Sequence, residues 1–489
     1  MVAEATAIRR GEEYLASLRD GRLVWFEGEW VADVTSHPGL SEFAHTLAEF
    51  YDLHHDPELM PLLTMKSPTS GNLISASYLL PRSSEDLARR RQNVEFWARR
   101  CGGTAARLPD HMAFINNGIY DARKLVERVN PEYAENMVRW YEMVRENDLF
   151  QATCFSDPPR DRLRPAGDPE LPKVVQRTEN GIVVRGVKSV STIGVVANEL
   201  FCLNTARQKI PPEETIFFAI PLNTPGLRIV CRNRVTPDNP EEHPLAPFWD
   251  EMDATMIFDD VFVPRERIFY APEEEPDDPN FAVRLFSNTL NWALWGTLTR
   301  TTVKTETLLG IVAALTDYLG TSKQMPVQLA IADMVVYVEA LRALIVAAER
   351  QPWTTPSGFL APNASLVTVG RTMITERHSQ ILESVRELAG SGLLMSPNQA
   401  DLANPRIGPL LRQFFVGRDE RAEERFRMQK LAWDYVADSF GGRQLVFEIY
   451  NSRGTIDNKL SLLQGYDLRP HIEQAKKLAG IETEKPSQD

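Results

Sequence analysis

A proline corner that carries two arginines is the first stretch of this sequence with residues suited to chemistry. Residues 157–162 read DPPRDR, so Arg160 and Arg162 stand on a stiff turn after a long helical pattern. Two guanidinium groups held close together suit an anion, such as a cofactor phosphate, because each can donate two parallel charged hydrogen bonds. The alternative is a solvated surface turn in which the arginines pair with Asp157 and Asp161.

A second stretch, ARLPDHMAF, places Arg107 four residues before His111. Pro109 and Asp110 are typical of the first turn of a helix. If the helix has already begun at Arg107, this spacing places the two side chains beside each other, and a histidine near an arginine tends to stay neutral. A neutral imidazole can accept a proton, so His111 is a candidate base. The alternative is a solvated arginine followed by a half-exposed helix histidine.

The elements that must position these residues form three successive blocks in a chain of 489 residues. Helical patterns dominate the first block. Strand patterns follow, and Asn180-Gly181 between β-branched runs predicts a hairpin. Helical patterns then return almost to the end. Segregated helices and strands predict an α+β fold with domains at 1–150, 151–276 and 277–489.

Composition excludes several classes of protein. A net charge of −13 without a basic block argues against nucleic-acid binding. No apolar run approaches the roughly 20 residues of a membrane span, and the first residues do not read as a signal peptide. The cysteines lie far apart, so we expect no metal site and no disulfide framework, and a cytoplasmic location. Phosphate-binding motifs of the Rossmann and P-loop types are absent from the sequence.

Motifs spread over nearly the whole chain resemble the 4-hydroxyphenylacetate 3-hydroxylase family. They include ARLPDH, DPPRDR, GIVVRGVKSVST, EEHPLA, EMDATMIFDDVFVPRERIF and FGGRQLVFE, in the order of the family. Such proteins are large oxygenase components of two-component monooxygenases, including chlorophenol and nitrophenol hydroxylases. The resemblance implies an acyl-CoA-dehydrogenase-like fold, with a helical N-terminal domain, a central antiparallel β domain and a C-terminal four-helix bundle.

The resemblance also implies the chemistry. A separate NAD(P)H-dependent flavin reductase would supply FAD in its reduced form, FADH2, to a homotetramer of this chain. Reduced FAD would react with O2 to form a C4a-hydroperoxide, which transfers one oxygen atom to an aromatic or heteroaromatic substrate. The flavin performs the redox chemistry, so the protein has to orient the partners and exclude water.

The residue patterns and the family resemblance together nominate two sets of site residues. Arg107 and His111 would be catalytic and would bind substrate together with Thr153, Asn204, Thr205, Trp292 and Trp295. The cofactor would contact Thr153, Phe155, Pro159, Arg160, Asp161, Arg162 and Thr192, and also Gly454, Thr455, Ile456 and Asp457 on a loop that reaches across a subunit boundary. For Thr192 the alternative is an ordinary strand threonine, and for the two tryptophans it is packing between helices.

Departures from the family leave the substrate open. Thr153 stands where hydroxyphenylacetate enzymes have a histidine, and His111 stands where they have a tyrosine. The first helix after the β block lacks the histidine of the chlorophenol branch. The substrate can therefore be a phenol, a heteroaromatic ring, a natural-product intermediate or an alkene. The alternative functions are an acyl-CoA dehydrogenase, a 4-hydroxybutyryl-CoA dehydratase, for which Cys101 lacks a neighbouring cysteine ligand, and a scaffold without flavin.

Overall fold

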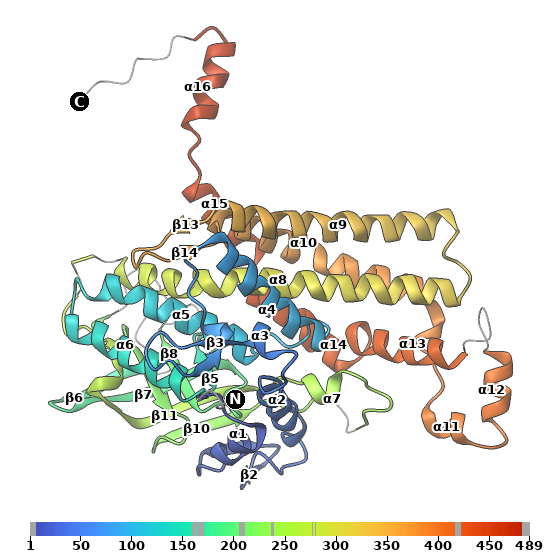
Figure 1. Cartoon of the computed structure of the whole chain (residues 1–489), viewed down its shortest axis with the longest axis horizontal. Helices are drawn as coiled ribbons and strands as arrows, with labels where there is room; N and C mark the ends of the chain where they lie inside the picture. Colours follow the sequence, from blue (N-terminus) through green and yellow to red (C-terminus); the bar gives the residue numbers. More distant parts are fainter. Residues whose placement is uncertain are drawn as a thin grey trace.

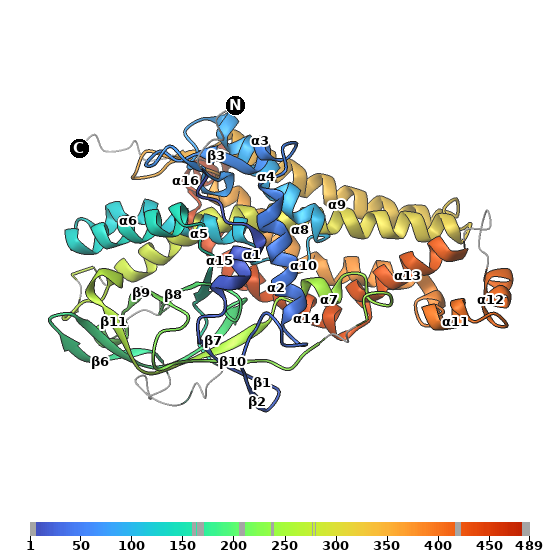
Figure 2. The ribbon, with the colours of Figure 1, turned by 60° about the horizontal axis from the view of Figure 1, so that its bottom comes forward.

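The computed structural model describes residues 6–158, 163, 171–204, 211–235, 239–275, 277–278, 280–415 and 422–481. Five residues nominated above, Pro159, Arg160, Asp161, Arg162 and Thr205, lie outside these ranges. Long helices run across one side of the molecule and two β-sheets lie on the other, with α5 and α6 over the strands (Figures 1 and 2).

Helices make up most of the first block, as predicted. Ser83 caps α4, because its hydroxyl accepts the Asp86 N–H while the Asp86 carboxylate accepts the Ser83 N–H. Prolines begin α5 and α6, where a missing N–H does no harm. The helices of this block are α1 (Gly11–Ser17), α2 (Ser41–Leu53), α3 (Met60–Leu63), α4 (Ser84–Arg100), α5 (Pro109–Val126) and α6 (Pro131–Glu146).

The strands form two principal sheets. The six-stranded sheet has the order β2 (Glu29–Val31), β1 (Leu23–Phe26), β10 (Leu227–Cys231), β11 (Asp253–Pro264), β7 (Gly181–Thr192) and β6 (Lys173–Thr178). The four-stranded sheet has the order β12 (Ile268–Tyr270), β9 (Phe217–Pro221), β8 (Glu199–Leu203) and β5 (Gln151–Cys154). Thr178 pairs with Gly181, so the hairpin expected at Asn180-Gly181 is confirmed.

The central sheet differs from the sequence-based expectation in one respect, because two of its strands come from the helical first block. β1 pairs parallel to β10, and β2 pairs antiparallel to β1. Val24 and Phe26 of β1 are fully buried. The alternation in LVWF therefore places two apolar side chains in the shared core, and their burial holds the first block against the sheet.

The third block is a helical bundle of α8 (Phe281–Tyr318), α9 (Met325–Arg350), α10 (Ala364–Ala389) and α13 (Ala422–Val436). α8 is central to it, since every residue from 295 to 305 is buried. α14 (Ser439–Asn451) and α15 (Thr455–Gly465) follow, and the exposed α16 (Arg469–Leu478) projects away from the body (Figure 1). Within the described residues, none of the helices combines the length and apolarity needed to cross a bilayer.

Candidate active site

A glycine turn before α5 brings the loop of Arg107 against the bundle. Gly103 has a φ of +71°, and a Cβ there would come within 2.6 Å of the Lys304 Cβ on α8. The carbonyl of Gly103 accepts a hydrogen bond of 2.5 Å from the Arg300 guanidinium, also on α8. The close approach requires a glycine, and it fixes the start of the loop on the central helix.

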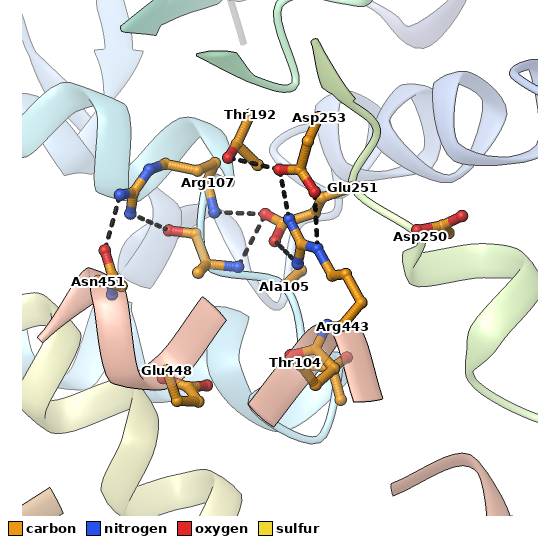
Figure 3. A network of polar contacts seen from close by, with 12 residues as sticks. Thr104, Ala105, Arg107, Thr192, Asp250, Glu251, Asp253, Arg443, Glu448 and Asn451 are labelled. Atoms are coloured by element: carbon orange, nitrogen blue, oxygen red, sulfur yellow. Dashed lines mark hydrogen bonds and ion pairs between the residues drawn. The ribbon is translucent and has the colours of Figure 1, made fainter. Parts of the chain in front are cut away.

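Arg107 and His111 lie side by side. The Nη1 of Arg107 is 3.0 Å from Nε2 of His111, so the proximity expected from their spacing is confirmed. α5 begins only at Pro109, with Leu108 as its N-cap, so the long arginine side chain reaches the histidine from the loop before the helix. Nη2 of Arg107 donates a hydrogen bond of 2.7 Å to Oδ1 of Asn451, at the end of α14 (Figure 3).

The environment keeps this histidine neutral and this arginine charged. Burial, and then the charges of Arg107 and Arg300, hold the pKa of His111 well below its usual value. Because Arg107 can only donate, the neutral ring accepts at Nε2 and carries its proton on Nδ1. Burial lowers the pKa of Arg107 to about 10, which still leaves the guanidinium protonated at neutral pH.

A cavity is lined by His111 and by the residues on either side of Arg107. Trp97 of α4, Asp110, His111 and Phe114 of α5, and Gly296 and Arg300 of α8 line it together with Ala105, Ala106 and Leu108 of the loop. Most of this wall is apolar, and its polar groups lie on α5 and α8. Burial also raises the pKa of the Asp110 carboxyl to about 7. The cavity is small, and its lining combines an apolar wall with a few polar groups.

The loop is held from the other side by a buried carboxylate. Oε1 of Glu251 accepts the backbone N–H groups of Ala106 at 2.8 Å and Arg107 at 2.5 Å (Figure 3). Arg443 of α14 donates to Oε2 of Glu251 at 3.3 Å and to both carboxylate oxygens of Asp253 at 2.7 and 2.9 Å. Burial would raise the pKa of Asp253, but the charges of Arg443 and Arg232 and the hydrogen bonds from Arg443 and Thr192 together outweigh it and lower that pKa to about 2.

A second buried carboxylate neutralises the cations of α8. Glu448 is fully buried and accepts from Arg300 at 2.6 and 2.7 Å and from Lys304 at 3.0 Å. Burial would raise the pKa of Glu448, but these two cations outweigh it and lower that pKa. Arg300 and Arg443 thus have carboxylate partners. Among the described residues, no carboxylate pairs with the Arg107 guanidinium, whose partners are His111, Asn451 and a backbone carbonyl.

The two nominated tryptophans lie between α5 and α8. Trp292 and Trp295 are almost fully buried. The indole N–H of Trp292 is 3.5 Å from the Asp121 carboxylate, and the Trp295 ring packs edge-on against Phe114 at 5.9 Å. Phe114 also lines the cavity, so Trp295 backs the pocket wall. Both tryptophans thus pack between helices. Of the two, Trp295 is the one that contacts a residue of the cavity wall, Phe114.

The nominated residues of the β domain divide between two places. Thr192, at the end of β7, donates a hydrogen bond of 2.7 Å to Asp253, so it belongs to the network around Arg107. Thr153 is buried on β5 opposite Phe201. Phe155 packs edge-on against Phe201 and against Phe286 of α8. Asn204 donates to the carbonyls of residues 172 and 214, which ties it to the β domain.

The segment 454–457, which we expected to be a loop, is instead the N-cap and first turn of α15, and it starts three residues after Asn451. Gly454, with a φ of +69°, is the N-cap of α15. Thr455 donates 2.8 Å to Thr375 of α10. Ile456 is 74% exposed in the single chain, an exposure that suits contact with another subunit.

One trio in the described residues has the composition of a metal site. The ligand atoms of His243, Asp434 and Asp438 lie within 4.8 Å of one another. Nδ1 of His243 already donates 2.8 Å to Asp434, whose other oxygen accepts the N–H groups of Leu245 and Ala246. These hydrogen bonds give the trio a structural role, because they join α13 to the loop before α7 (Ala246–Trp249).

Sequence reasoning missed the residues that surround Arg107. Glu251, Asp253, Arg443, Glu448 and Asn451 were not nominated. Four of them stand in motifs that carried the family resemblance, EMDATMIFDDVFVP and FGGRQLVFE. Buried charges in such motifs were the available signal, because a buried carboxylate needs a partner. Asn451 had no comparable signal.

Comparison with known proteins identifies the family. The model of the 4-hydroxyphenylacetate 3-hydroxylase N-terminal domain matches residues 10–270, and the model of its C-terminal domain matches residues 284–480. This chain belongs to the 4-hydroxyphenylacetate 3-hydroxylase family. The predicted family, fold class, enzyme class and FAD cofactor are confirmed by these matches and by the relatives below.

Curated relatives cover almost the whole chain. The 4-hydroxyphenylacetate 3-monooxygenase oxygenase component of Thermus thermophilus is 33% identical over 474 residues, 96% of each protein. The oxygenase component of the 4-nitrophenol 4-monooxygenase/4-nitrocatechol 2-monooxygenase of Rhodococcus opacus is 34% identical over 461 residues, 91% of this chain and 85% of the relative.

Solved structures give the same result. The oxygenase component HpaB of 4-hydroxyphenylacetate 3-monooxygenase, complexed with FAD and 4-hydroxyphenylacetate, matches with a TM-score of 0.90 and 32% identity, over 96% of this chain and 98% of the other. An archaeal 4-hydroxybutyryl-CoA dehydratase from N. maritimus matches with a TM-score of 0.87 at 21% identity, which shows a shared fold only.

Proposed function

We propose that this chain inserts one oxygen atom of O2 into an aromatic or heteroaromatic substrate that carries an ionisable oxygen, using FADH2 from a separate NAD(P)H-dependent flavin reductase. The observation that carries this proposal is the Arg107 guanidinium, which contacts the cavity-lining His111 and has no carboxylate partner among the described residues. Burying an unpaired cation is costly, so the site is suited to a ligand that supplies the negative charge.

Arg107 and His111 would divide the work on the substrate. The fixed cation of Arg107 favours the ionised form of a phenol, or binds a carboxylate. His111 would accept the substrate proton at Nε2, the atom that now receives the Arg107 hydrogen bond. His111 is thereby our candidate for the function of the histidines that this chain lacks. Trp295 and Phe114 would complete the apolar wall, and Trp292, Thr153, Asn204 and Thr205 remain proposed substrate contacts.

Buried groups next to the site fit FAD. Three polar atoms, Ser191 Oγ, Asn451 Nδ2 and Ser452 Oγ, have no hydrogen-bond partner among the described residues. Thr192 adds a hydroxyl on the strand beside Ser191. Hydroxyl and amide groups suit the polar edge of a flavin ring, and arginines suit its phosphates. When bound in its reduced form, FAD supplies the electrons that activate O2.

The proposed cofactor contacts are grouped in three places. They are residues 153–162, where the phosphate contact is assigned to Arg162, the β7 residue Thr192, and the segment 454–457. Lys188 is buried and donates to the Asp157 carboxylate at 2.7 Å and to the Phe155 carbonyl at 3.1 Å. That contact holds the start of the first group beside β7 and supports a shared site with Thr192.

The assembly proposed for this enzyme is a homotetramer. Apolar side chains stay exposed along α9 and from α14 to α15, among them Met325, Leu329, Val336, Tyr450, Ile456 and Leu463. Such surfaces are typical of contacts between subunits. We also propose a cytoplasmic location, which the four free cysteines support.

Oxygen transfer with chemically regenerated FADH2 tests the proposal. The chain is incubated with a panel of phenols and heteroaromatic acids, and products heavier by one oxygen atom are sought by mass spectrometry. Arg107→Ala should abolish the product while O2 consumption continues, because the flavin reaction does not need this cation. If both proteins form the product equally, Arg107 does not act on the substrate. Reduction of bound FAD by an acyl-CoA would instead favour a dehydrogenase.

A further inference from the structure

One stripe of α14 faces the site. Arg443, Phe447 and Asn451 are spaced four residues apart, so they lie on the same face of the helix. The Phe447 ring lies 4.6 Å from the Arg443 guanidinium and 5.3 Å from that of Arg107. Asn451 accepts the hydrogen bond from Arg107. The stripe therefore contacts Arg107 directly at its C-terminal end and holds Arg443 at its N-terminal end.

Arg443 joins the Arg107 loop to the Thr192 strand. Its guanidinium contacts Glu251, which accepts the backbone N–H of Arg107, and Asp253, which accepts the hydroxyl of Thr192 (Figure 3). The two carboxylates are two residues apart; the Glu251 side chain is fully buried, and the Asp253 side chain is 16% exposed. Arg232 also pairs with Asp253 at 3.0 Å, so removal of Arg443 would chiefly leave the buried Glu251 carboxylate without a side-chain cation partner among the described residues, next to a second negative charge.

We propose that Arg443 is a positioning residue for oxygen transfer, which sets the place of Arg107 relative to Thr192. This inference rests on the proposed function, in which Arg107 serves the substrate and Thr192 the flavin. Nε, Nη1 and Nη2 of Arg443 are all engaged with the two carboxylates, so it acts through them. Transfer between two bound partners depends on their distance, and a displacement of about 1 Å can cost about a hundredfold in rate.

The shape of the side chain matters as well as its charge. A planar fork can serve two carboxylates at once, whereas a lysine ammonium is a point charge on a flexible stem. Arg443→Lys keeps the positive charge but loses the planar guanidinium group, and Arg443→Gln loses both. The two variants should therefore form a graded series.

The test has one readout that needs no flavin. 4-Nitrophenol changes its absorption when it ionises, so a pH titration of the protein-bound probe reports its pKa. The wild type should lower that pKa because Arg107 favours the phenolate. Arg443→Gln should abolish most of the shift, and Arg443→Lys should keep part of it.

The second readout is coupling with FADH2 and O2. Product formed per O2 consumed should fall about tenfold in Arg443→Gln and less in Arg443→Lys. FADH2 affinity should fall by a smaller factor than coupling does, because Arg443 reaches the proposed cofactor site only through Thr192, one of several proposed contacts. Arg267→Lys is the matched control, since Arg267 pairs with the buried Glu199 at 2.6 Å in the β domain. It should lower thermal stability and leave both readouts unchanged.

Three results would overturn the inference. An unchanged probe shift and unchanged coupling in Arg443→Gln, with only a stability loss like that of Arg267→Lys, would make Arg443 purely structural. A loss of FADH2 affinity together with an unchanged probe shift would place Arg443 in the cofactor site and leave Arg107 independent of it. A wild type that leaves the nitrophenol pKa unchanged would overturn the proposed role of Arg107, and the inference would fall with it.

Discussion

Glu448 offers the sharpest stability test of the buried charge network. Its carboxylate is fully buried and accepts three charged hydrogen bonds, two from Arg300 and one from Lys304, at 2.6–3.0 Å. Glu448→Gln keeps the volume but replaces one carboxylate oxygen by an NH2 group that faces a cation. Two buried cations would then lack a counter-charge, and removing one member of such a cluster costs about 3–5 kcal/mol of unfolding free energy.

The effect should depend on pH in a defined direction. The folded protein lowers the pKa of Glu448 from its ordinary value of 4.5, so the stabilisation is present above that value and is lost as pH falls towards the folded pKa. Glutamine does not titrate. The difference in unfolding free energy between the two proteins should therefore be largest near neutral pH and should shrink below about pH 4.5.

Urea unfolding at equal chain concentration, followed by circular dichroism, measures the difference, because association would otherwise shift the midpoint. Glu383→Gln is the matched control, since Glu383 pairs with Arg386 at 2.9 Å on the exposed surface of α10. That exposed pair should contribute about 0–1 kcal/mol. If Glu448→Gln costs no more than Glu383→Gln, or if its cost does not change with pH, the buried cluster is not the stabilising unit described above.

Other predictions concern different parts of the molecule. Asp110→Asn should show the opposite pH trend, because burial raises the pKa of Asp110 from 3.8 to about 7. As the pH rises through this window, the wild type should lose about 1.4 kcal/mol of unfolding free energy per pH unit relative to the variant. A constant difference from pH 4 to 7 in urea unfolding would contradict it. Arg162→Ala should weaken FADH2 binding by about 1.5–3 kcal/mol, and excess FADH2 should restore activity. If the variant binds FADH2 as tightly as the wild type, Arg162 does not contact the cofactor, and the alternative of a solvated surface turn holds. Light scattering at micromolar concentration should give a tetramer, and a monomeric mass would contradict the proposed assembly.

The fold was largely predictable because its signals are local. Asn180-Gly181 predicted its hairpin through the turn conformation that these residues favour. Pro109 marked the start of its helix for a similar local reason. The addition of β1 to the central sheet was not predicted, because it depends on pairing with β10, about 200 positions later in the chain.

The site was predictable only where its residues are near in sequence. The spacing of Arg107 and His111 predicted that they lie together, and the nearby cation predicted a neutral histidine; in the structure burial lowers the pKa of His111 more than that charge does. Glu251 and Asn451 lie 144 and 344 residues from Arg107, and only the packing of α14 and β11 against the loop brings them into contact. Charge pairing between distant elements has no local signal beyond the presence of charges in otherwise apolar motifs.

The most direct test of the central claim, that the Arg107 pocket directs oxygen to an ionised aromatic substrate, is a single-turnover reaction under isotopically labelled O2. Wild-type protein is mixed anaerobically with FADH2 and a phenolic substrate identified in the panel, and labelled O2 is then added. The account predicts a product with one labelled oxygen atom in the wild type, and labelled hydrogen peroxide in its place with Arg107→Ala. Unlabelled oxygen in the product, or equal labelling with both proteins, would contradict it.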